Sequence, residues 1–431
     1  MREMKDSGIN YIGLIPQTWK TTTTKRLFRV ESGATPATDK PENFDGQITW
    51  ITPADYKTND VYVSTGRRNL SEEGLSSCSA VLVPAGSIIF SKRAPIGSVA
   101  IASKELCTNQ GCLSCVPQNE VSSEFFYYCM SVLTEQYQLL GTGTTFKEIS
   151  LSSFANFALP FPSFLEQSRI AAYLDRRCAA IDALIANQQQ QIDKLKQYKQ
   201  AVITEAVTRG LDPNVRMKDS GVEWIGEVPE NWRVCRKLSY QCIEGITYGI
   251  VKLFEPDDIQ GIKVIRCSDV FEGHIDPSNI RTVTREVSNE YKRTILHGGE
   301  VVVNVRGSLG GCAVVPYEMS GFNIAREVAM VRLSDVYVNR FVMYFFLSSA
   351  FTRYQQAHLS GSVYVGLNIE LLSSCTLPWP SKSEQQSIVA YLDTKCAQID
   401  ALIALKQQKA DKLAQYKKSL IYEVVTGKRE V

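Results

Sequence analysis

The residues best suited to metal or nucleophile chemistry are few, and their spacing does not build a site. Cys112 and Cys115 form a lone CxxC pair, whereas a structural zinc site takes four ligands, usually from two such pairs. The three histidines, His274, His297 and His358, lie in the other half of the chain and suggest no Ser/His/Asp or Cys/His arrangement. We therefore interpret the two cysteines as buried thiols of a β segment.

Motifs that would hold a nucleotide, a methyl donor or a nuclease metal are also missing. Gly307–Gly311 is rich in glycine but lacks the lysine of a phosphate-binding loop, so a turn between strands is the favoured interpretation. The Asn/Asp-Pro-Pro-aromatic signature of adenine methylation does not occur, and Pro256-Asp257 is followed by Gly261-Ile-Lys263, with glycine where a nuclease needs a metal-binding carboxylate. The sequence thus predicts a chain that is not an enzyme by itself and that holds no metal and no cofactor.

The composition is that of a globular protein without bulk affinity for polyanions. Of 431 residues, 44% are hydrophobic, and 47 Lys and Arg stand against 45 Asp and Glu. No run reaches the ~18 apolar residues of a membrane-spanning helix, and the first residues lack the apolar core of a signal peptide. Twelve cysteines without such a signal indicate reduced thiols. We expect a cytoplasmic protein that makes no membrane contact.

The elements that must position any functional side chain occur twice. Met4–Pro16 returns as Met217–Pro229, and Ile181–Ala186 recurs unchanged as Ile399–Ala404. Two copies that each span half of a chain indicate an internal duplication rather than a solenoid. Between these matches the copies diverge, which is what a protein needs if it must recognise two different targets with one architecture.

The near-identical segments predict two long helices. Ser163…Glu166 and Ser381…Glu384 fit the capping box, in which the serine caps the helix and the glutamate reaches back to the cap. A heptad-like apolar seam follows each box, interrupted at Gln188/Lys406 and Lys199/Lys417, and Gly210 and Gly427 end the helices. Each helix would be about 45 residues and ~65–70 Å long. A duplicated chain that pairs its copies about a pseudo-two-fold axis makes them antiparallel; the alternative is two ordinary amphipathic helices inside one globule.

The diverged segments predict mixed domains. Apolar runs at Val81–Val83, Ile88–Phe90 and Val301–Val303 are expected strands, and Phe125–Met130 and Phe341–Phe346 are expected buried helices. The predicted fold class is α+β, with two mixed α/β recognition domains separated by the two long helices. The expected domains are an N-terminal segment with recognition domain 1 at 1–158, helix 1 at 159–210, a linker at 211–232, recognition domain 2 at 233–376, and helix 2 with the C-terminal tail at 377–431.

The duplicated order of motifs resembles the specificity subunit of type I restriction–modification systems. The resemblance rests on a Leu-Pro-x-Pro-Ser-like lead, Glu-Gln, a Tyr-Leu-Asp segment and Ile-Asp-Ala-Leu-Ile in each copy, and it covers essentially the whole chain. Gly33-Ala-Thr-Pro36, Trp50–Asp55 and Asn109-Gln110 agree with it, whereas the second copy departs from it with Gly245-Ile-Thr-Tyr248 and Asn323-Ile324.

The resemblance implies a non-catalytic DNA sequence-specificity subunit. Each recognition domain would read one half of a bipartite site in double-stranded DNA, and the paired helices would set the spacer and dock two adenine-methyltransferase (modification) subunits. S-adenosylmethionine, ATP and Mg²⁺ are then expected on partner subunits, which include the modification subunits and two restriction/translocase subunits. The alternatives are a two-domain coiled-coil scaffold that binds other proteins, and a stand-alone enzyme with an unrecognised site.

Local charge fits a reader that depends on its partners. Residues 21–158 carry 11 Lys and Arg against 13 Asp and Glu, and residues 233–376 carry 15 against 14. Such a chain releases few counterions when it binds DNA alone. We therefore expect the isolated chain to bind DNA weakly and in a salt-sensitive way.

Forked donors and amides are the side chains that read base edges, and these guide the choice of contact residues. The predicted DNA-binding residues are Lys57, Arg67, Arg68, Lys92, Arg93, Thr144, Lys147, Arg266, Asn304, Arg306, Ser362 and Tyr364. Arg93 and Arg306 follow a strand at matching positions, so they contact either bases or a shared phosphate; for any single residue the alternative is a solvated charge or a turn-stabilising side chain. The predicted partner-docking residues on the helices are Gln167, Tyr173, Asp182, Gln385, Tyr391 and Asp400, although some of these could face the opposing helix.

Overall fold

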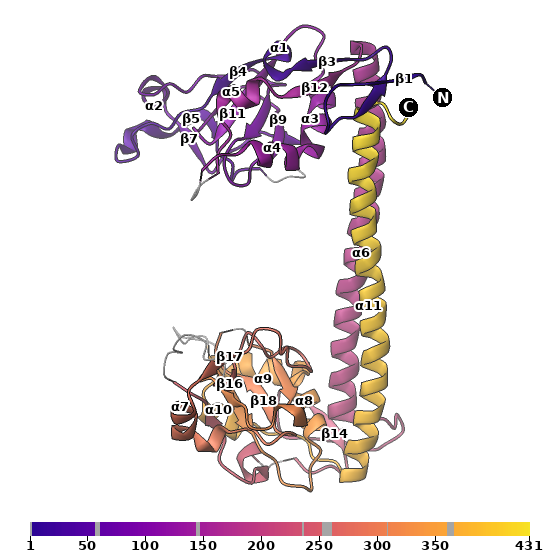
Figure 1. Ribbon diagram of the computed structural model, residues 1–431. Helices are drawn as coiled ribbons and strands as arrows, with labels where there is room; N and C mark the ends of the chain where they lie inside the picture. Colours follow the sequence, from indigo (N-terminus) through magenta and orange to yellow (C-terminus); the bar gives the residue numbers. More distant parts are fainter. Residues whose placement is uncertain are drawn as a thin grey trace. The chain divides into compact units, whose positions relative to one another are not determined.

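The computed structural model describes residues 2–56, 61–143, 147–234, 237–251, 261–307, 309–359 and 366–431. The chain divides into two compact units, each assembled from distant parts of the sequence (Figure 1). The first unit comprises Met1–Gln188 and Gln408–Val431, and the second comprises Gln189–Gln407. Each unit therefore contains one mixed domain together with part of both long helices.

The first unit is built around a five-stranded sheet with a smaller sheet beside it. Its strands are β1 (Met4–Asp6), β2 (Leu14–Pro16), β3 (Lys20–Thr23), β4 (Phe28–Ser32), β5 (Phe44–Ile51), β6 (Tyr62–Val63), β7 (Arg68–Leu70), β8 (Ile88–Ser91), β9 (Val99–Ala102), β10 (Cys107–Thr108), β11 (Cys112–Pro117) and β12 (Ala158–Phe161). Its helices are α1 (Thr24–Leu27), α2 (Glu72–Ser76), α3 (Ser123–Val132), α4 (Thr134–Leu140) and α5 (Leu151–Ala155), with a 3₁₀ turn at Pro41–Asn43.

The second unit has its own set of shorter elements. Its strands are β13 (Met217–Asp219), β14 (Glu227–Pro229), β15 (Thr247–Tyr248), β16 (Ile262–Ile265), β17 (Arg281–Val283), β18 (Val301–Asn304), β19 (Cys312–Val314), β20 (Asn323–Ile324) and β21 (Val328–Val331). Its helices are α7 (Arg285–Glu290), α8 (Asn339–Phe346), α9 (Ser349–Leu359) and α10 (Ile369–Ser374), with 3₁₀ turns at Leu238–Gln241, Lys292–Thr294 and Tyr317–Met319.

The two mixed domains share one topology, as the duplication predicts. The strand order β4-β11-β8-β9 of the first unit returns as β15-β21-β18-β19 in the second, and β10-β5-β7 returns as β20-β16-β17. In each smaller sheet the central strand is parallel to one neighbour and antiparallel to the other. The α+β fold with an internal repeat is therefore confirmed.

Most of the expected local elements are present. Ile88–Phe90 and Val301–Val303 lie in β8 and β18, and the aromatic segments form the buried helices α3 and α8. The strand expected at Val81–Val83 is wrong, because only Val83 pairs there, in an isolated bridge to Leu106. The segment follows a helix and leads directly into the turn before β8, so it has no room to extend a ladder.

The near-identical segments form the long helices α6 (Phe164–Arg209) and α11 (Lys382–Val425), of 46 and 44 residues. In the first unit the start of α6 shares a hydrophobic cluster with the end of α11, for example Leu174 with Leu420. In the second unit the end of α6 shares a cluster with the start of α11, for example Ile203 with Leu392. The pairing within each unit is thus antiparallel, because the beginning of one helix packs on the end of the other.

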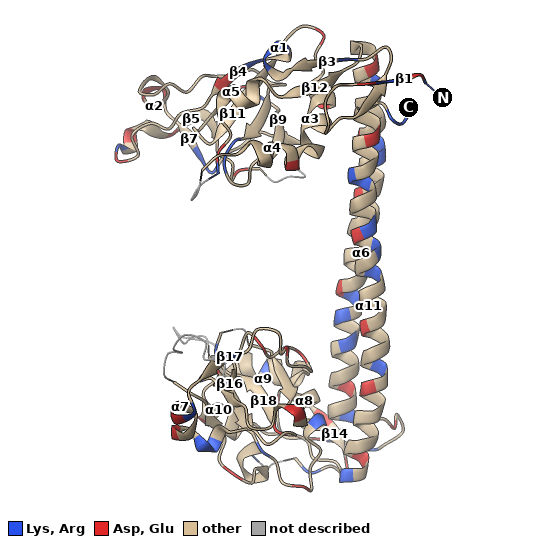
Figure 2. Ribbon diagram, in the orientation of Figure 1, with Lys and Arg blue, Asp and Glu red and all other residues tan. Residues whose placement is uncertain are grey.

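Ion pairs repeat this antiparallel arrangement. In the first unit Lys417 Nζ lies 2.7 Å from Asp182 Oδ2, and in the second Lys199 Nζ lies 2.8 Å from Asp400 Oδ2. Both lysines are the polar interruptions of the predicted seam, and each reaches a carboxylate of the opposing helix. Figure 2 shows Lys, Arg, Asp and Glu interspersed along both helices, as expected for helices whose outer faces meet water.

At the starts of α6 and α11 only one of the two contacts of the predicted capping box is present. Ser163 Oγ and Ser381 Oγ accept the backbone N–H groups of Glu166 and Glu384, at 3.4 and 3.3 Å. The glutamate side chains do not reach back to the cap. They accept the indole N–H groups of two buried tryptophans instead, at 2.9 Å from Trp19 and 2.8 Å from Trp232. The box is therefore only half correct, because an indole donor competes for the carboxylate.

The helix ends follow the prediction. Gly210 and Gly427 have φ of +77° and +72°, the left-handed conformation that favours glycine. A Cβ on Gly427 would lie 2.4 Å from Cδ of Pro16, so the hairpin β1–β2 packs tightly on the end of α11. Among the described residues no helix is long and apolar enough to cross a membrane.

Candidate nucleic-acid interface

Two predicted cations of the first unit share one carboxylate just beyond strand β8. Glu148 lies 2.9 Å from Lys92 Nζ and 2.8 Å from Arg93 Nε. Partial burial works to raise the pKa of Glu148, but the hydrogen bonds and charges of Lys92 and Arg93 outweigh it and hold that pKa below its usual value. The pair is therefore clamped and partly neutralised.

Arg306, the counterpart of Arg93, is exposed and held differently. Arg93 forms an isolated β-bridge with Glu148, and Arg306 forms the same kind of bridge with Gly366. Because glycine stands where the first copy has glutamate, this carboxylate clamp is lost. The guanidinium lies instead over the ring of Tyr248, 5.5 Å from its centroid. A cation–π contact leaves the positive charge intact, so Arg306 presents more charge than Arg93.

Arg67 and Arg68 enter and begin strand β7, next to acidic partners. Arg67 donates from its backbone N–H to Asp55 at 3.0 Å and from Nη2 to the Ala54 carbonyl at 3.2 Å. Arg68 lies 4.0 Å from the centroid of the Phe44 ring and 3.2 Å from Asp45. Both side chains stay exposed at the surface of the small sheet.

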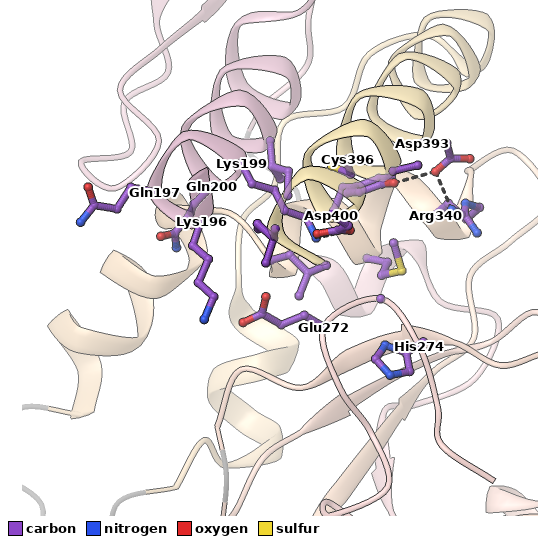
Figure 3. Close-up of a pocket in the computed structure, with 17 residues that line it drawn as sticks. Lys196, Gln197, Lys199, Gln200, Glu272, His274, Arg340, Asp393, Cys396 and Asp400 are labelled. Atoms are coloured by element: carbon purple, nitrogen blue, oxygen red, sulfur yellow. Dashed lines mark hydrogen bonds and ion pairs between the residues drawn. The ribbon is translucent and has the colours of Figure 1, made fainter. Parts of the chain in front are cut away.

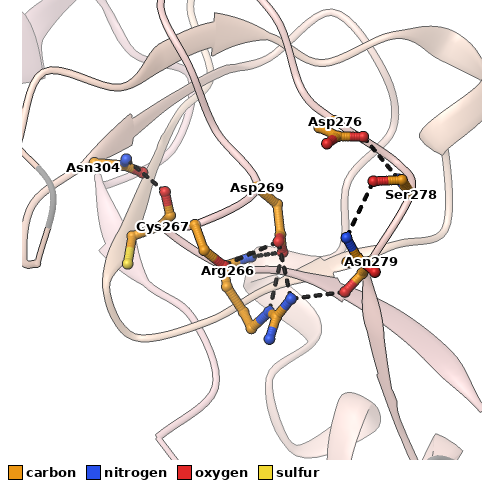
Figure 4. Close-up of polar contacts among 8 residues, drawn as sticks. Arg266, Cys267, Asp269, Asp276, Ser278, Asn279 and Asn304 are labelled. Atoms are coloured by element: carbon orange, nitrogen blue, oxygen red, sulfur yellow. Dashed lines mark hydrogen bonds and ion pairs between the residues drawn. The ribbon is translucent and has the colours of Figure 1, made fainter. Parts of the chain in front are cut away.

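Arg266 is fixed at the corresponding sheet of the second unit (Figure 4). Its Nε and Nη2 donate to the two carboxylate oxygens of Asp269 at 3.1 and 3.0 Å, and Nη2 also donates to the Asn279 carbonyl at 2.7 Å. This bidentate geometry is the strong form of an arginine–carboxylate contact. The guanidinium is therefore held in one orientation.

Asn304 is placed inside the domain rather than on its surface. The residue is 1% exposed, and its Nδ2 donates to the carbonyls of Cys267 at 2.9 Å and Val270 at 3.2 Å. The amide fastens the loop that carries Arg266 and Asp269 (Figure 4). In the described arrangement Asn304 supports a surface loop and has no face toward solvent.

The remaining predicted contacts are only partly described. Lys147 is exposed close to Glu148. Lys57, Thr144, Ser362 and Tyr364 lie outside the described residues.

The sequence interpretation missed a polar hollow beside Tyr248. A cavity of about 310 Å³ is lined by Tyr248, Asn289, Tyr291, Lys292 and Arg293, among others. Lys292 and Arg293 are exposed there. The signal was available, because the aligned positions of the first copy, residues 79 and 80, are uncharged; a cation pair present in only one copy is what differing specificity requires.

Of the predicted docking residues, several are occupied within their own unit. Gln167 and Gln385 are buried, and their amides hold backbone groups at the helix starts, for example Ser122 N at 2.9 Å and Val338 N at 2.9 Å. Asp182 and Asp400 form the ion pairs between the helices. Tyr173 is half-buried and Tyr391 is exposed.

The helices expose apolar side chains that the sequence interpretation did not single out. Leu184 and Leu402 occupy equivalent positions, as do Tyr198 and Tyr416, and all are between 43% and 51% exposed. Large apolar side chains are therefore exposed to solvent at the same two places of both helices.

A larger cavity of about 760 Å³ lies in the second unit between the long helices, α8 and the loop at Glu272–His274 (Figure 3). Arg340 of its lining pairs with Asp393, which also accepts the hydroxyl of Tyr344 at 2.6 Å. The first unit has the same tyrosine–aspartate contact, Tyr128 to Asp175 at 2.7 Å. These polar contacts attach α3 to α6 and α8 to α11.

The cysteines have the environment of core residues. Cys112 and Cys115 lie buried in strand β11, and burial raises the pKa of the Cys112 thiol to about 12. Such thiols are poor nucleophiles and metal ligands at neutral pH. Among the described residues no three His, Cys, Asp or Glu side chains gather as a metal site would require.

Comparison with known proteins identifies a matching family and several similar proteins. The family model described as type I restriction modification DNA specificity domain matches residues 16–197 and 250–415. The MjaIX specificity subunit of Methanocaldococcus jannaschii is 38% identical over 43% of this chain and 43% of its own length. The EcoBI subunit of Escherichia coli is 26% identical over 67% of this chain and 61% of its own. These matches span less than two thirds of either relative, whereas the MjaVIII subunit of M. jannaschii matches at 21% identity over 97% of this chain and 94% of its own.

Two solved structures share the fold. A chain from a study of complex assembly and conformational transition in a type I restriction–modification system aligns with a TM-score of 0.70 at 17% identity, over 95% of this chain and 98% of that one. The HsdS subunit of Thermoanaerobacter tengcongensis aligns with a TM-score of 0.50 at 17% identity, over 96% and 98% of the two chains. At this identity the likeness establishes the fold.

Proposed function

The chain belongs to the family of type I restriction–modification specificity subunits, and from this membership we propose that its two mixed domains each read one half of a bipartite DNA site. The observation that carries the proposal is one topology used twice with different surface chemistry. The Arg93 position is clamped by Glu148, whereas the Arg306 position faces Gly366 and stacks on Tyr248. Domains that shared one target would have no reason to differ at the same place.

The proposed contact set keeps the residues chosen from the sequence and changes them only where the structure describes their exposure. In the first unit it consists of Lys57, Arg67, Arg68, Lys92, Arg93, Thr144 and Lys147. In the second it consists of Arg266, Lys292, Arg293, Arg306, Ser362 and Tyr364. Lys292 and Arg293 are added to the proposed contacts because they line the hollow beside Tyr248. Asn304 leaves the set because it is buried and fastens a loop.

We propose that the paired helices act as a ruler for the DNA between the half-sites. A helix of 46 residues is about 69 Å long, close to two turns of B-DNA at ~34 Å each. Within each unit the apolar seam and the ion pairs hold the two helices together. Each helix buries its apolar residues against the other, which supports a stiff helix pair.

The exposed faces of the same helices are the proposed docking sites for two modification subunits. Leu184 and Leu402 are exposed at equivalent positions of the two helices, as are Tyr198 and Tyr416, which suits two copies of one partner. S-adenosylmethionine, ATP and Mg²⁺ are assigned to the modification and restriction subunits. The chain itself supplies sequence recognition and geometry.

Reconstitution tests the proposal. The chain alone should bind duplex DNA weakly, with affinity that falls steeply as salt rises, because its 47 Lys and Arg are nearly balanced by 45 Asp and Glu. Together with its modification subunit it should direct adenine methylation to one sequence. Tight sequence-specific binding by the isolated chain at physiological salt would contradict the division of labour. Assembly without any DNA-dependent activity would favour a protein-binding scaffold.

A further inference from the structure

Two buried carboxylates occupy equivalent places at the ends of the central strands of the small sheets. Asp55 follows β5 and Asp269 follows β16, and their side chains are only 2% and 4% exposed. A buried carboxylate needs partners, because an unpaired one would be costly. Each carboxylate makes one contact that is the same in both copies and one contact that differs between them.

The shared contact closes a turn. Asp55 Oδ2 accepts the backbone N–H of Thr52 at 2.7 Å, and Asp269 Oδ2 accepts the backbone N–H of Arg266 at 2.8 Å. Residues 52 and 266 occupy the same place in the two copies, three positions before the aspartate. One oxygen is sufficient for this turn, so it does not account for the rest of the carboxylate.

The contact that differs is the one with an arginine, because the arginine occupies a different sequence position in each copy. In the first copy Asp55 Oδ1 faces Arg67, which immediately precedes the neighbouring strand β7, at 3.0 Å from its backbone N and 3.8 Å from Nε. In the second copy Asp269 Oδ1 accepts from Arg266 Nη2 at 3.0 Å. The carboxylate is constant and the source of the guanidinium varies.

We infer that Asp55 and Asp269 are positioning residues, each a fixed carboxylate that aims a variable arginine at DNA. The inference rests on the proposed function. A free arginine loses side-chain freedom when it binds, and a guanidinium already held by a carboxylate and a backbone carbonyl avoids much of that loss. The pairing also keeps a buried negative charge from opposing DNA.

The two sites differ in strength. Arg266 is held by two carboxylate contacts and one carbonyl and is 22% exposed, whereas the contact of Arg67 with Asp55 through Nε is longer and its side chain is 77% exposed. The Nη1 group of Arg266 has no partner among the described residues and remains to donate to a base edge or a phosphate. Asp269 should therefore matter more than Asp55.

A double-mutant cycle in the chain reconstituted with its modification subunit tests the inference. The probe is a duplex carrying the sequence that this complex methylates, together with duplexes in which one half-site is replaced. Arg266→Ala should weaken binding about 5- to 150-fold, the range of a good arginine contact. Asp269→Asn should weaken it at least about 5-fold, and adding it to Arg266→Ala should cost nothing further. All losses should vanish when the half-site read by the second unit is replaced.

Two further variants keep the test sharp. Asp55→Asn is the matched control, and it should affect only the other half-site, by a smaller factor. Arg266→Lys keeps the charge but not the fork, so it should behave like Arg266→Ala; this variant also decides the matter if Asp269→Asn does not fold. Normal binding by Asp269→Asn or Arg266→Lys, or an equal cost of Asp269→Asn with and without Arg266, would overturn the inference. A wild-type complex that binds no sequence preferentially would instead overturn the proposed function.

Discussion

At the scale of single residues, the two copies differ in the side chains that contact each arginine. Arg93 and Arg306 could be chosen from the sequence because they follow a strand at matching positions. Their partners could not, because Glu148 is 55 positions from Arg93 along the chain and pairs with it only after the domain closes. The burial of Asn304 escaped prediction for a similar reason, since its amide is fixed by carbonyls more than 30 positions away.

The clamp predicts a reciprocal pair of variants. Glu148→Gln should raise the affinity of the complex for duplex DNA and increase the magnitude of its log Kd against log salt slope by up to about one, because Lys92 and Arg93 become free to meet a phosphate. Gly366→Glu should do the reverse by pairing with Arg306. Gly366 does not have a positive φ, and a Cβ there would lie 3.3 Å from the Val305 carbonyl oxygen, a tight contact that a shift of a few tenths of an ångström relieves.

Salt titrations of DNA binding measure both variants. If the two substitutions shift affinity in the same direction, or leave it unchanged, the charge of the clamp does not govern DNA contact.

At the scale of elements, the duplication made the long helices and their antiparallel pairing predictable, because an apolar seam of that length needs a matching partner. The capping box was only half right. Its glutamates lie three positions from their serines, as the motif requires, but each carboxylate accepts an indole N–H from a tryptophan that follows a hairpin about 150 positions away. Local motifs do not reveal such a competitor.

The indole contact predicts a measurable loss of stability. Glu384→Ala should lower the free energy of unfolding by about 1–3 kcal/mol, because the buried N–H of Trp232 loses its charged acceptor. The exposed neighbour Gln386 provides the control, and Gln386→Ala should leave the unfolding midpoint within experimental scatter. Thermal or denaturant unfolding of the chain makes the comparison; equal midpoints for both variants would show that the indole bond contributes nothing.

The exposed leucines predict the stoichiometry of assembly. Leu402→Glu and Leu184→Glu should each leave a complex with one modification subunit, and the double variant should bind none, because each substitution places a charge at one of the two proposed docking positions. Native mass spectrometry reads the composition directly, with unchanged unfolding midpoints as the control for folding. Retention of two subunits by both single variants would place docking elsewhere on the chain.

At the scale of the whole molecule, the account rests on two dissimilar readers in one chain. The internal repeat predicted the architecture because two similar sequence segments are expected to adopt the same fold. It did not predict which side chains face DNA, since these lie in the diverged segments where only folding brings Arg266 to Asn279, or Arg306 to Tyr248.

Methylome sequencing of a host that expresses this chain with its modification partner tests the central claim most directly. The account predicts one asymmetric motif made of two different half-sites with an unspecified gap of constant length. A palindromic motif, a single uninterrupted motif, or a gap that varies from site to site would contradict it.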